Sequence, residues 1–356
     1  MVADCPLQRC RLLGVAVLAL CVPGVTMRAQ QPAPQPPQAT FRTQSNLVLV
    51  PTLVEGSGGE PVFGLTARDF TVTDNGVPQK IRLEAGTDKA PMSIVLLVQT
   101  GRSAYREFYK MAGLPTMAEG LAGDVAHRIA VVTFDSQPRE ILDFTNNAAA
   151  VRQSVYSIEP GDDGAAILDA VWYAVDMLDD EPQQNQRVIV LLSETRDHGS
   201  RTPVRSLVRK IGRSDVVVYS LAFSPGRGDL FDFSGAGGSA DLLAPLRLAI
   251  QAVRRNTAAA IPNMTGGRYL RFNRDKQFDA ELGQLANQVH NRYVLTFQPP
   301  DPAPGFHQLH VTLNQPLQAR VLARTNYWAQ GPPAPDTPPA PETPATPETP
   351  SAGSPD

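Results

Sequence analysis

Residues 93–105 read SIVLLVQTGRSAY, an apolar run that ends in Gln-Thr-Gly-Arg-Ser. Three further segments have this pattern: RIAVVTFD at 128–135, RVIVLLSE at 187–194 and VVVYSLAF at 216–223. Apolar runs without alternation are typical of strands buried on both faces, such as parallel strands between two layers of helices. Because ligands bind at the carboxyl ends of such strands, residues 99–103 are the first candidate for a functional site.

Helical patterns separate these strands. Helices are expected at 104–122, 146–158, 165–179, 202–213, 241–258 and 277–291. The segment PREILDF at 138–144 predicts an antiparallel edge strand. The alternation of strand and helix predicts an α/β domain over residues 89–292, with a doubly wound, mostly parallel, Rossmann-like sheet.

Both flanks of this α/β segment have β patterns. Before it, strands are expected at 47–55, 70–73 and 78–85, and Asp74-Asn75-Gly76 is a strong hairpin signal between the last two. After it, strands are expected at 293–300, 306–314 and 319–328. We therefore predict a small β module at 41–88, with residues 293–329 packing either on that module or on the main sheet.

The two ends of the chain have different compositions. Arg9 and Arg11 precede the apolar run 12–22, and a small-residue site at Ala29 follows, which is typical of a cleaved secretory signal over residues 1–29. Lipidation at Cys21 is the alternative. Residues 30–40 form a Pro/Gln-rich linker, and residues 330–356 a Pro-rich tail that is expected to be disordered. We therefore expect an exported protein, either periplasmic or extracellular.

Composition excludes several classes of function. The three cysteines all lie in the expected signal, so the mature chain has no thiol for a disulfide or a nucleophile. A formal net charge of −3 without a basic run argues against nucleic-acid binding. The mature chain has no second apolar run long enough to span a membrane. The five histidines have no metal-ligand spacing and no nucleophile elbow occurs, so we predict no enzymatic activity.

Three loops are expected at the carboxyl edge of the sheet, at 99–103, 161–170 and 193–199. Order, spacing and local sequence here resemble a von Willebrand factor type A (vWA) domain, and the flanks resemble an exported bacterial vWFA-related group. The matching pieces lie at 69–81, 94–103, 129–136, 163–171, 187–197, 265–272 and 292–300. The resemblance implies a Rossmann-like fold and a role in protein interaction or adhesion.

The resemblance also implies a metal-ion-dependent adhesion site, and here the sequence departs from the family. The family pattern is an Asp-x-Ser-x-Ser loop, a Thr and an Asp, which bind a magnesium ion through oxygen atoms. The corresponding residues of this chain are Gln99, Gly101, Ser103, Ala165 and Glu194. Gly101 and Ala165 have no side-chain oxygen, so we predict a degenerate site without a metal or another cofactor.

Two alternatives remain for this edge. Arg102 and Arg196 either take the place of the metal, pairing with Glu194 or a partner's carboxylate, or face solvent. A shifted magnesium or calcium site would instead use carboxylates at positions 162, 163, 169 and 197. The predicted binding residues are Gln99, Gly101, Arg102, Ser103, Asp163, Ala165, Glu194, Arg196 and Asp197.

These observations favour a non-enzymatic interaction module that binds a protein or cell-envelope partner without a metal ion. The alternative is a cation-dependent adhesion or scaffolding domain that uses non-standard ligands. The sequence does not determine the oligomeric state.

Overall fold

The structure is a computed structural model that describes residues 47–85, 89–105, 120, 123–223, 243–272, 283, 285–300 and 302–330, without the side chains of Arg102, Ser103 and Phe272. The expected signal peptide, the linker and all of the tail beyond Gln330 lie outside these residues, as does most of the helix expected at 104–122. Among the described residues, none of the helices has the length and hydrophobicity needed to cross a membrane.

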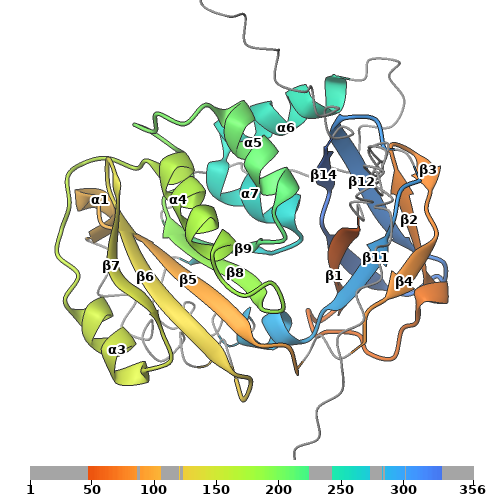
Figure 1. Cartoon of the computed structure of the whole chain (residues 1–356), viewed down its shortest axis with the longest axis horizontal. Helices are drawn as coiled ribbons and strands as arrows, with labels where there is room; N and C mark the ends of the chain where they lie inside the picture. Colours follow the sequence, from red (N-terminus) through yellow and green to blue (C-terminus); the bar gives the residue numbers. More distant parts are fainter. Residues whose placement is uncertain are drawn as a thin grey trace, which may run out of the picture. The chain divides into compact units, whose positions relative to one another are not determined.

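A six-stranded sheet forms the centre of the α/β segment (Figure 1). Its strands are β5 (Met92–Gln99), β6 (His127–Phe134), β7 (Pro138–Thr145), β8 (Gln186–Ser193), β9 (Val217–Phe223) and β10 (Tyr269–Phe272). Their order in space is β10-β9-β8-β5-β6-β7. All neighbours are parallel except β7, which pairs antiparallel with β6 at one edge. The predicted doubly wound fold class is confirmed.

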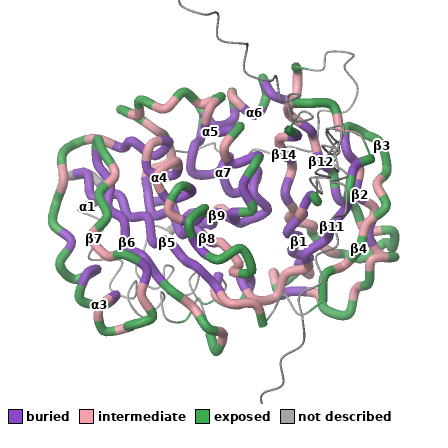
Figure 2. The backbone as a smooth tube through the Cα atoms, viewed as in Figure 1, coloured by how far each residue is buried: buried purple, intermediate pink, exposed green. Residues whose placement is uncertain are grey.

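Apolar side chains fill both faces of this sheet, and the inner strands are therefore buried along most of their length (Figure 2). Alternate residues of β5 belong to two separate cores: Leu96 lies in one and Leu97 in the other. The first core includes Val151 of α3 (Ala148–Tyr156), and the second includes Val171 of α4 (Ile167–Asp179). This two-sided burial explains why the strand sequences do not alternate.

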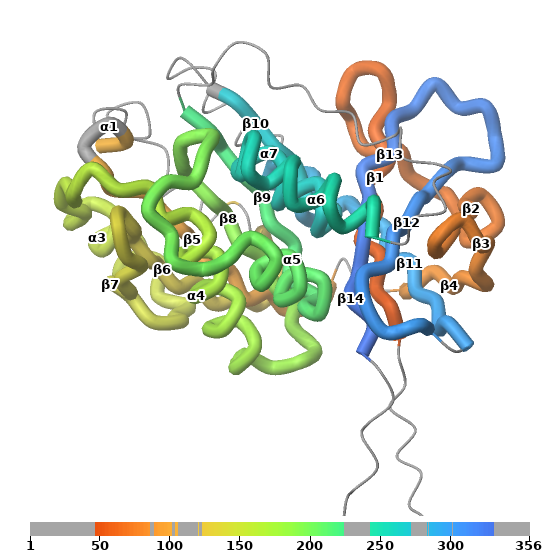
Figure 3. Tube along the Cα trace, turned by 90° about the horizontal axis from the view of Figure 1, so that it is seen from above, coloured from red at the N-terminus to blue at the C-terminus, as the bar shows by residue number. Residues whose placement is uncertain are grey.

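The second core also receives α5 (Val204–Arg213), α6 (Ala244–Arg255) and α7 (Thr257–Thr265). The sequence predicted a single helix over 241–258, which is wrong, because Asn256 separates α6 from α7. Its φ of −149° and ψ of 92° are extended, and its Oδ1 accepts a hydrogen bond from Ala259 N at 3.0 Å, which caps α7. Figure 3 shows α7 following α6 and lying against β9 and β10.

The flanks fold into two four-stranded sheets with a shared core. One sheet has the order β13 (Ala319–Ala323), β1 (Val48–Gly56), β11 (Tyr293–Phe297), β4 (Ile81–Leu83). The other has the order β14 (Asn326–Ala329), β12 (Gly305–Leu313), β2 (Phe70–Asp74), β3 (Val77–Pro78). Each sheet combines strands from both flanks, which confirms the predicted appended β module.

Two expected strands of this β sandwich are each divided between the sheets. Residues 78–85 contribute β3 to one sheet and β4 to the other, and residues 319–328 contribute β13 and β14 in the same way. The predicted hairpin is present: β2 pairs with β3 across Asn75-Gly76, and both turn residues have positive φ, 47° and 83°. Such values suit an Asn-Gly turn between twisted strands.

Arg324 lies at the crossing between β13 and β14 and joins the sandwich to α5. It is 5% exposed, and its Nη2 donates to Gly212 O at 2.8 Å and to Ile211 O at 3.3 Å. Its Nε donates to Asn326 O at 2.7 Å. Burial lowers the pKa of the guanidinium, and the charge of Asp215 opposes this effect. A cation here also complements the negative carboxyl end of α5.

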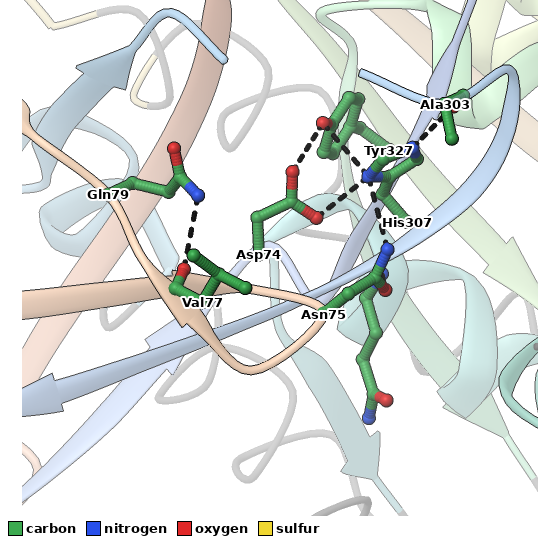
Figure 4. A network of polar contacts seen from close by, with 8 residues as sticks. Asp74, Asn75, Val77, Gln79, Ala303, His307 and Tyr327 are labelled. Carbon is green, nitrogen blue, oxygen red and sulfur yellow. Dashed lines mark hydrogen bonds and ion pairs between the residues drawn. The ribbon is translucent and has the colours of Figure 1, made fainter. Parts of the chain in front are cut away.

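A buried polar network lies within the sandwich (Figure 4). His307 Nδ1 is 2.8 Å from Asp74 Oδ1, and His307 Nε2 is 2.6 Å from Ala303 O. Tyr327 donates its hydroxyl hydrogen to Asp74 Oδ2 at 2.6 Å. Since both ring nitrogens of His307 face acceptors, the network favours the doubly protonated imidazolium. Burial lowers the pKa of His307, but the hydrogen bonds that its ring donates to Asp74 and to Ala303 O raise the pKa by more, and the net shift is upward.

This network predicts a pH-dependent stability. A histidine whose pKa is raised by folding stabilises the protein fully below its unfolded value of 6.5, and that contribution is lost as the pH rises through the folded value. We expect the free energy of unfolding to fall by on the order of 1 kcal/mol between about pH 6 and pH 9. Urea unfolding at several pH values measures it. His307→Gln should remove this slope, whereas the exposed His310→Gln in the same strand should retain it.

Candidate functional site

The strand order reverses between β5 and β8, because β6 and β7 continue to one side of β5 whereas β9 and β10 continue beyond β8. In open α/β sheets the crevice at such a reversal, outside the carboxyl ends of the strands, is where ligands bind. Gln99 ends β5 and Glu194 follows β8, so the structure places both predicted residues at this crevice.

The side chain of Gln99 is 1% exposed and spans three loops. Its Oε1 accepts a hydrogen bond from Glu194 N at 2.8 Å, and its Nε2 is 3.5 Å from the carbonyl oxygen of Gly164. One neutral amide thus contacts the loop after β8 and the loop before α4 at the same time. A carboxylate at this position would have no donor to offer to the carbonyl of Gly164.

Gly101 permits a close approach of the second loop. A Cβ at this position would lie 2.7 Å from Gly164 O and 3.3 Å from Asp162 O, both of them backbone atoms. Contacts below 3.0 Å require the backbone to shift, so a serine does not fit here without moving that loop. The space that the serine side chain of the family pattern would fill is occupied here by the backbone of Gly164.

Ala165 is fully buried and anchored through its main chain. Its N donates to His198 O at 3.1 Å, and His198 N donates to Ala165 O at 3.0 Å, which forms an isolated antiparallel bridge between two loops. His198 Nε2 also donates to Asp163 O at 3.1 Å. Asp163 itself is exposed at the tip of its loop.

Asp197 and Asp169 hold the loop after β8 against the start of α4. Asp197 Oδ1 accepts hydrogen bonds from Leu168 N at 3.0 Å and from Ser200 Oγ at 2.5 Å. Asp169 accepts from Arg201 N at 2.9 Å and Thr202 N at 2.8 Å. Burial raises the pKa of Asp169, but the hydrogen bonds from Thr202 and Arg201 lower it more. Both carboxylates are thus engaged by hydrogen-bond donors.

Of the two arginines predicted at this edge, Arg196 has a described side chain and Arg102 does not. Arg196 is exposed, and its Nε donates to Arg255 O at 3.1 Å, at the carboxyl end of α6. Arg102 and Ser103 belong to the short helix α1 (Arg102–Tyr105), and their side chains lie outside the described part of the structure. The proposed pairing of Arg102 with Glu194 therefore stays a prediction.

Asp135, which the sequence analysis did not select, is part of the same edge. It follows β6, is 8% exposed, and accepts hydrogen bonds from Gln137 N at 3.1 Å and Asp162 N at 3.3 Å. A Cβ on Gly161 would lie 2.4 Å from its Oδ2. The sequence signal for this contact is Gly161-Asp162-Asp163-Gly164, in which Gly161 packs against Asp135 and Gly164 packs against Ser136.

Asp162 adds a further hydrogen-bonded carboxylate. Its Oδ1 accepts from Gly164 N at 2.7 Å and Ser136 N at 3.1 Å. The hydrogen bond from the Ser136 side chain, followed by the one from Gly164, lowers the pKa of Asp162.

The residues present do not match the oxygen shell of a magnesium adhesion site. Gly101 and Ala165 offer no side-chain ligand, and the oxygen of Gln99 already accepts a hydrogen bond from Glu194 N. Among the residues that the structure describes, no group of three or more histidines, cysteines, aspartates and glutamates is placed to hold a metal ion. The geometry instead gives a hydrogen-bonded surface with an exposed rim of loop residues.

A surface hollow of about 420 Å³ lies beside this rim. It is lined by Gln137, Pro138, Asp169, Trp172, Tyr173, Arg201 and Thr202. The lining combines two aromatic rings with an arginine and an aspartate, which suits contact with a protein surface.

These features define a doubly wound α/β domain whose switch point is surrounded by hydrogen-bonded loops. Residues 98–196 match the family model of the von Willebrand factor type A domain, a segment that runs from the end of β5 to the loop after β8. This match confirms the resemblance to a vWA domain that the sequence indicated. No curated protein matches the chain.

Several solved structures are similar to this chain. BatB from Bacteroides thetaiotaomicron is 12% identical with a TM-score of 0.40, over 56% of this chain and 98% of that one. A von Willebrand factor type A protein from Catenulispora acidiphila is 11% identical with a TM-score of 0.40, over 80% and 75%. The vWF domain of the pili tip protein Mfa5 from Porphyromonas gingivalis is 18% identical with a TM-score of 0.26, over 31% and 39%.

Proposed function

We propose that this chain is an exported, non-enzymatic interaction module that binds a protein or cell-envelope partner through the carboxyl edge of its vWA sheet, without a metal ion. The binding surface is formed by the loops at 99–103, 161–166 and 194–199. The observation that supports this most strongly is the Gln99 side chain, whose amide links all three loops by hydrogen bonds.

The packing around Gln99 supports metal independence. In a cation-dependent site the ion draws the loops together through shared oxygen ligands. Here hydrogen bonds and close main-chain contact do so: Gly161 N donates to Thr100 O at 2.7 Å, and Gly164 O lies where a Cβ of Gly101 would extend. The loops thus have a fixed arrangement before any partner arrives, which lowers the entropic cost of binding.

The exposed rim supports a partner with mixed polar chemistry. Asp163, Arg196 and His198 are exposed on neighbouring loops. The hollow lined by Trp172 and Tyr173 continues this surface with aromatic area. Tryptophan, tyrosine and arginine are the residues that most often contribute large energies at protein interfaces. Export of the chain rests on the signal pattern of residues 1–29.

Thermal unfolding with and without divalent cations tests the proposal. A ligand that binds only the folded state must raise the unfolding midpoint, by about 2.7 kcal/mol of stability at a hundredfold excess over its dissociation constant. We expect the midpoint in EDTA to be the same as the midpoint in millimolar magnesium or calcium.

A cation-dependent shift that disappears in Glu194→Ala would contradict metal independence and support the alternative, a cation-dependent adhesion or scaffolding domain. Asp143→Ala is the matched control, because Asp143 is an exposed carboxylate on the edge strand β7. A shift that Asp143→Ala removes equally would be non-specific ion binding, which leaves the metal-independent reading in place.

A further inference from the structure

The neighbouring helices α5 and α6 carry an excess of positive charge. Together they contain seven basic residues and no aspartate or glutamate, which gives a formal charge of +7. The whole chain has a net charge of −3, so the rest of it carries −10. The two helices pack beside each other on the same face of the sheet (Figure 1). Positive charge is therefore concentrated on one part of an otherwise acidic protein.

The arginines of α5 are open to solvent. Arg205, Arg209 and Arg213 are four residues apart, so they follow one face of the helix, and all three are exposed. Within the described part of the chain none of them forms a salt bridge. Lys210 differs, because it pairs with Asp176 of α4. The described residues therefore leave the charges of the three arginines to a partner from outside.

The exposed side of α6 combines arginines with leucines. Leu243, the residue before the helix, is 59% exposed, and Leu248 is 43% exposed. Leu243 lies four residues before the exposed Arg247. Leu248 lies seven residues before the exposed Arg255. At these spacings each leucine shares a line of the helix surface with an arginine.

The exposed arginines of the two helices form one surface, which we call the basic face. It consists of Arg205, Arg209, Arg213, Arg247, Arg254 and Arg255.

An aromatic ring lies beside the basic face. The guanidinium of Arg209 is 5.1 Å from the ring centre of Trp328 in β14. Trp328 is only partly buried, so part of its ring is accessible next to the arginine. Tryptophan is enriched at the level of lipid headgroups, because its ring is apolar and its N–H is polar.

We propose that the basic face docks on a membrane surface that contains anionic phospholipid. The guanidinium groups donate paired hydrogen bonds to lipid phosphates, and the leucines enter the boundary between headgroups and acyl chains. Charge attraction and apolar burial add together in this kind of binding. The docking goes beyond the carboxyl edge to a second surface, and it rests on the proposed export only for the membrane that the chain meets.

The exposed leucines favour lipid over an acidic protein or another soluble polyanion. A polyanion would neutralise the arginines but would leave Leu243 and Leu248 in water. A membrane surface offers phosphates and an apolar layer next to each other, so it complements both kinds of side chain.

Sedimentation with lipid vesicles tests the docking. The mature chain, residues 30–356, is used, because an uncleaved signal would itself enter the lipid. In EDTA and at low salt, it should bind vesicles of phosphatidylcholine with one third phosphatidylglycerol about tenfold or more tightly than vesicles of phosphatidylcholine alone. This preference should be lost at ~0.5 M salt, where charges are screened within a few ångströms.

The arginines of α5 are tested together. R205Q/R209Q/R213Q should bind the anionic vesicles about tenfold or more weakly than the wild type. R205K/R209K/R213K keeps the charges and should retain most of the binding. Equal binding by the wild type and R205Q/R209Q/R213Q would overturn the proposal.

Three exposed arginines of the β sandwich provide the matched control. R68Q/R82Q/R320Q removes the same total charge from another part of the surface and should bind as the wild type does. If this variant loses as much binding as R205Q/R209Q/R213Q, the attraction is a property of the overall charge and the basic face is not a docking surface.

Leu248→Gln distinguishes lipid from a soluble polyanion. It should weaken binding to the anionic vesicles severalfold, whereas Leu317→Gln, at a residue that is 41% exposed between β12 and β13, should not. Polyglutamate is the soluble probe. Binding to polyglutamate as tight as to the vesicles, with no effect of Leu248→Gln on either, would identify an acidic protein as the partner, and the lipid proposal would be wrong.

This proposal and the proposed function fail separately. The vesicle assay contains no divalent cation and no protein partner. A cation-dependent shift in thermal unfolding would contradict metal independence without changing the vesicle result. Equal vesicle binding by the wild type and R205Q/R209Q/R213Q would overturn membrane docking without affecting the carboxyl edge.

Discussion

Arg324→Met should lower the free energy of unfolding by about 3–5 kcal/mol, the range seen when one partner of a buried charged network is removed. The guanidinium of Arg324 donates to the carbonyls of Ile211, Gly212 and Asn326. Methionine fills similar space but offers no donor, so the carbonyls of Gly212 and Asn326 lose the hydrogen bonds from Arg324, whereas Ile211 O keeps those from Ser214. The end of α5 also loses the positive charge that complements its dipole.

Urea unfolding followed by circular dichroism measures this loss. The matched control is Arg82→Met on the edge strand β4, where the side chain is exposed and a change within about 0.5 kcal/mol is expected. Arg324→Lys should retain only part of the stability. Lysine keeps the positive charge, but its single ammonium cannot donate to all the carbonyls that the guanidinium reaches. A loss for Arg324→Met no larger than that for Arg82→Met would mean that this junction does not stabilise the fold.

Gln99→Glu should destabilise the protein by about 3 kcal/mol at pH 8, because it places an unpaired carboxylate in a buried position. The wild-type amide accepts from Glu194 N and faces Gly164 O with its nitrogen. Ionised glutamate retains the first contact but sets an oxygen against the carbonyl of Gly164. Protonated glutamate has the shape of glutamine and can donate to that carbonyl, so the folded variant should prefer to keep its proton.

The stability of the Gln99→Glu variant should depend on pH in one direction. Burial raises the pKa of the new glutamate above its unfolded value, so the folded variant binds more protons and its stability falls as the pH rises. A loss of about 3 kcal/mol corresponds to a rise of about two pKa units, so the loss should shrink to about 1 kcal/mol at pH 5 and disappear below about pH 4, the unfolded pKa of glutamate. Unfolding in EDTA at a series of pH values measures this.

Gln153→Glu on the exposed side of α3 is the control for Gln99→Glu, and it should show no such slope. A Gln99→Glu variant as stable as the wild type at pH 8 would contradict the bridging role of the amide, and with it the main support for a metal-independent edge.

The fold was predictable because burial on both faces is encoded locally. Leu96 and Leu97 are adjacent in an unbroken apolar run, and they belong to the two cores on opposite faces of the sheet. The predicted bounds were wrong where the sequence pattern continues but the chain changes direction. Residues 319–328 have an uninterrupted β pattern, yet Arg324 turns the chain from one sheet to the other. The α7 helix was missed because Pro262 lies within it.

The position of the candidate site was predictable, but its internal contacts were not. Apolar strands followed by Gln99 and Glu194 indicate a switch point, because strand ends gather polar loops. The hydrogen bonds of Gln99 join residues 95 and 65 positions apart, and no local pattern encodes which atoms meet over such separations. The buried Asp135 was overlooked for the same reason, since one of its two donors, Asp162 N, comes from another loop.

The order of strands in the sandwich has a consequence for folding. β1 pairs with β11 and β13, which are made only after the α/β domain has been synthesised. Until then β1 is a long apolar strand without these partners, the kind of segment that aggregates or requires a chaperone. Closing a loop of this length is slow, but an α/β domain that folds first shortens the effective separation of the flanks. Assembly of the sandwich should therefore follow folding of the α/β domain, and destabilising the core of that domain should delay it.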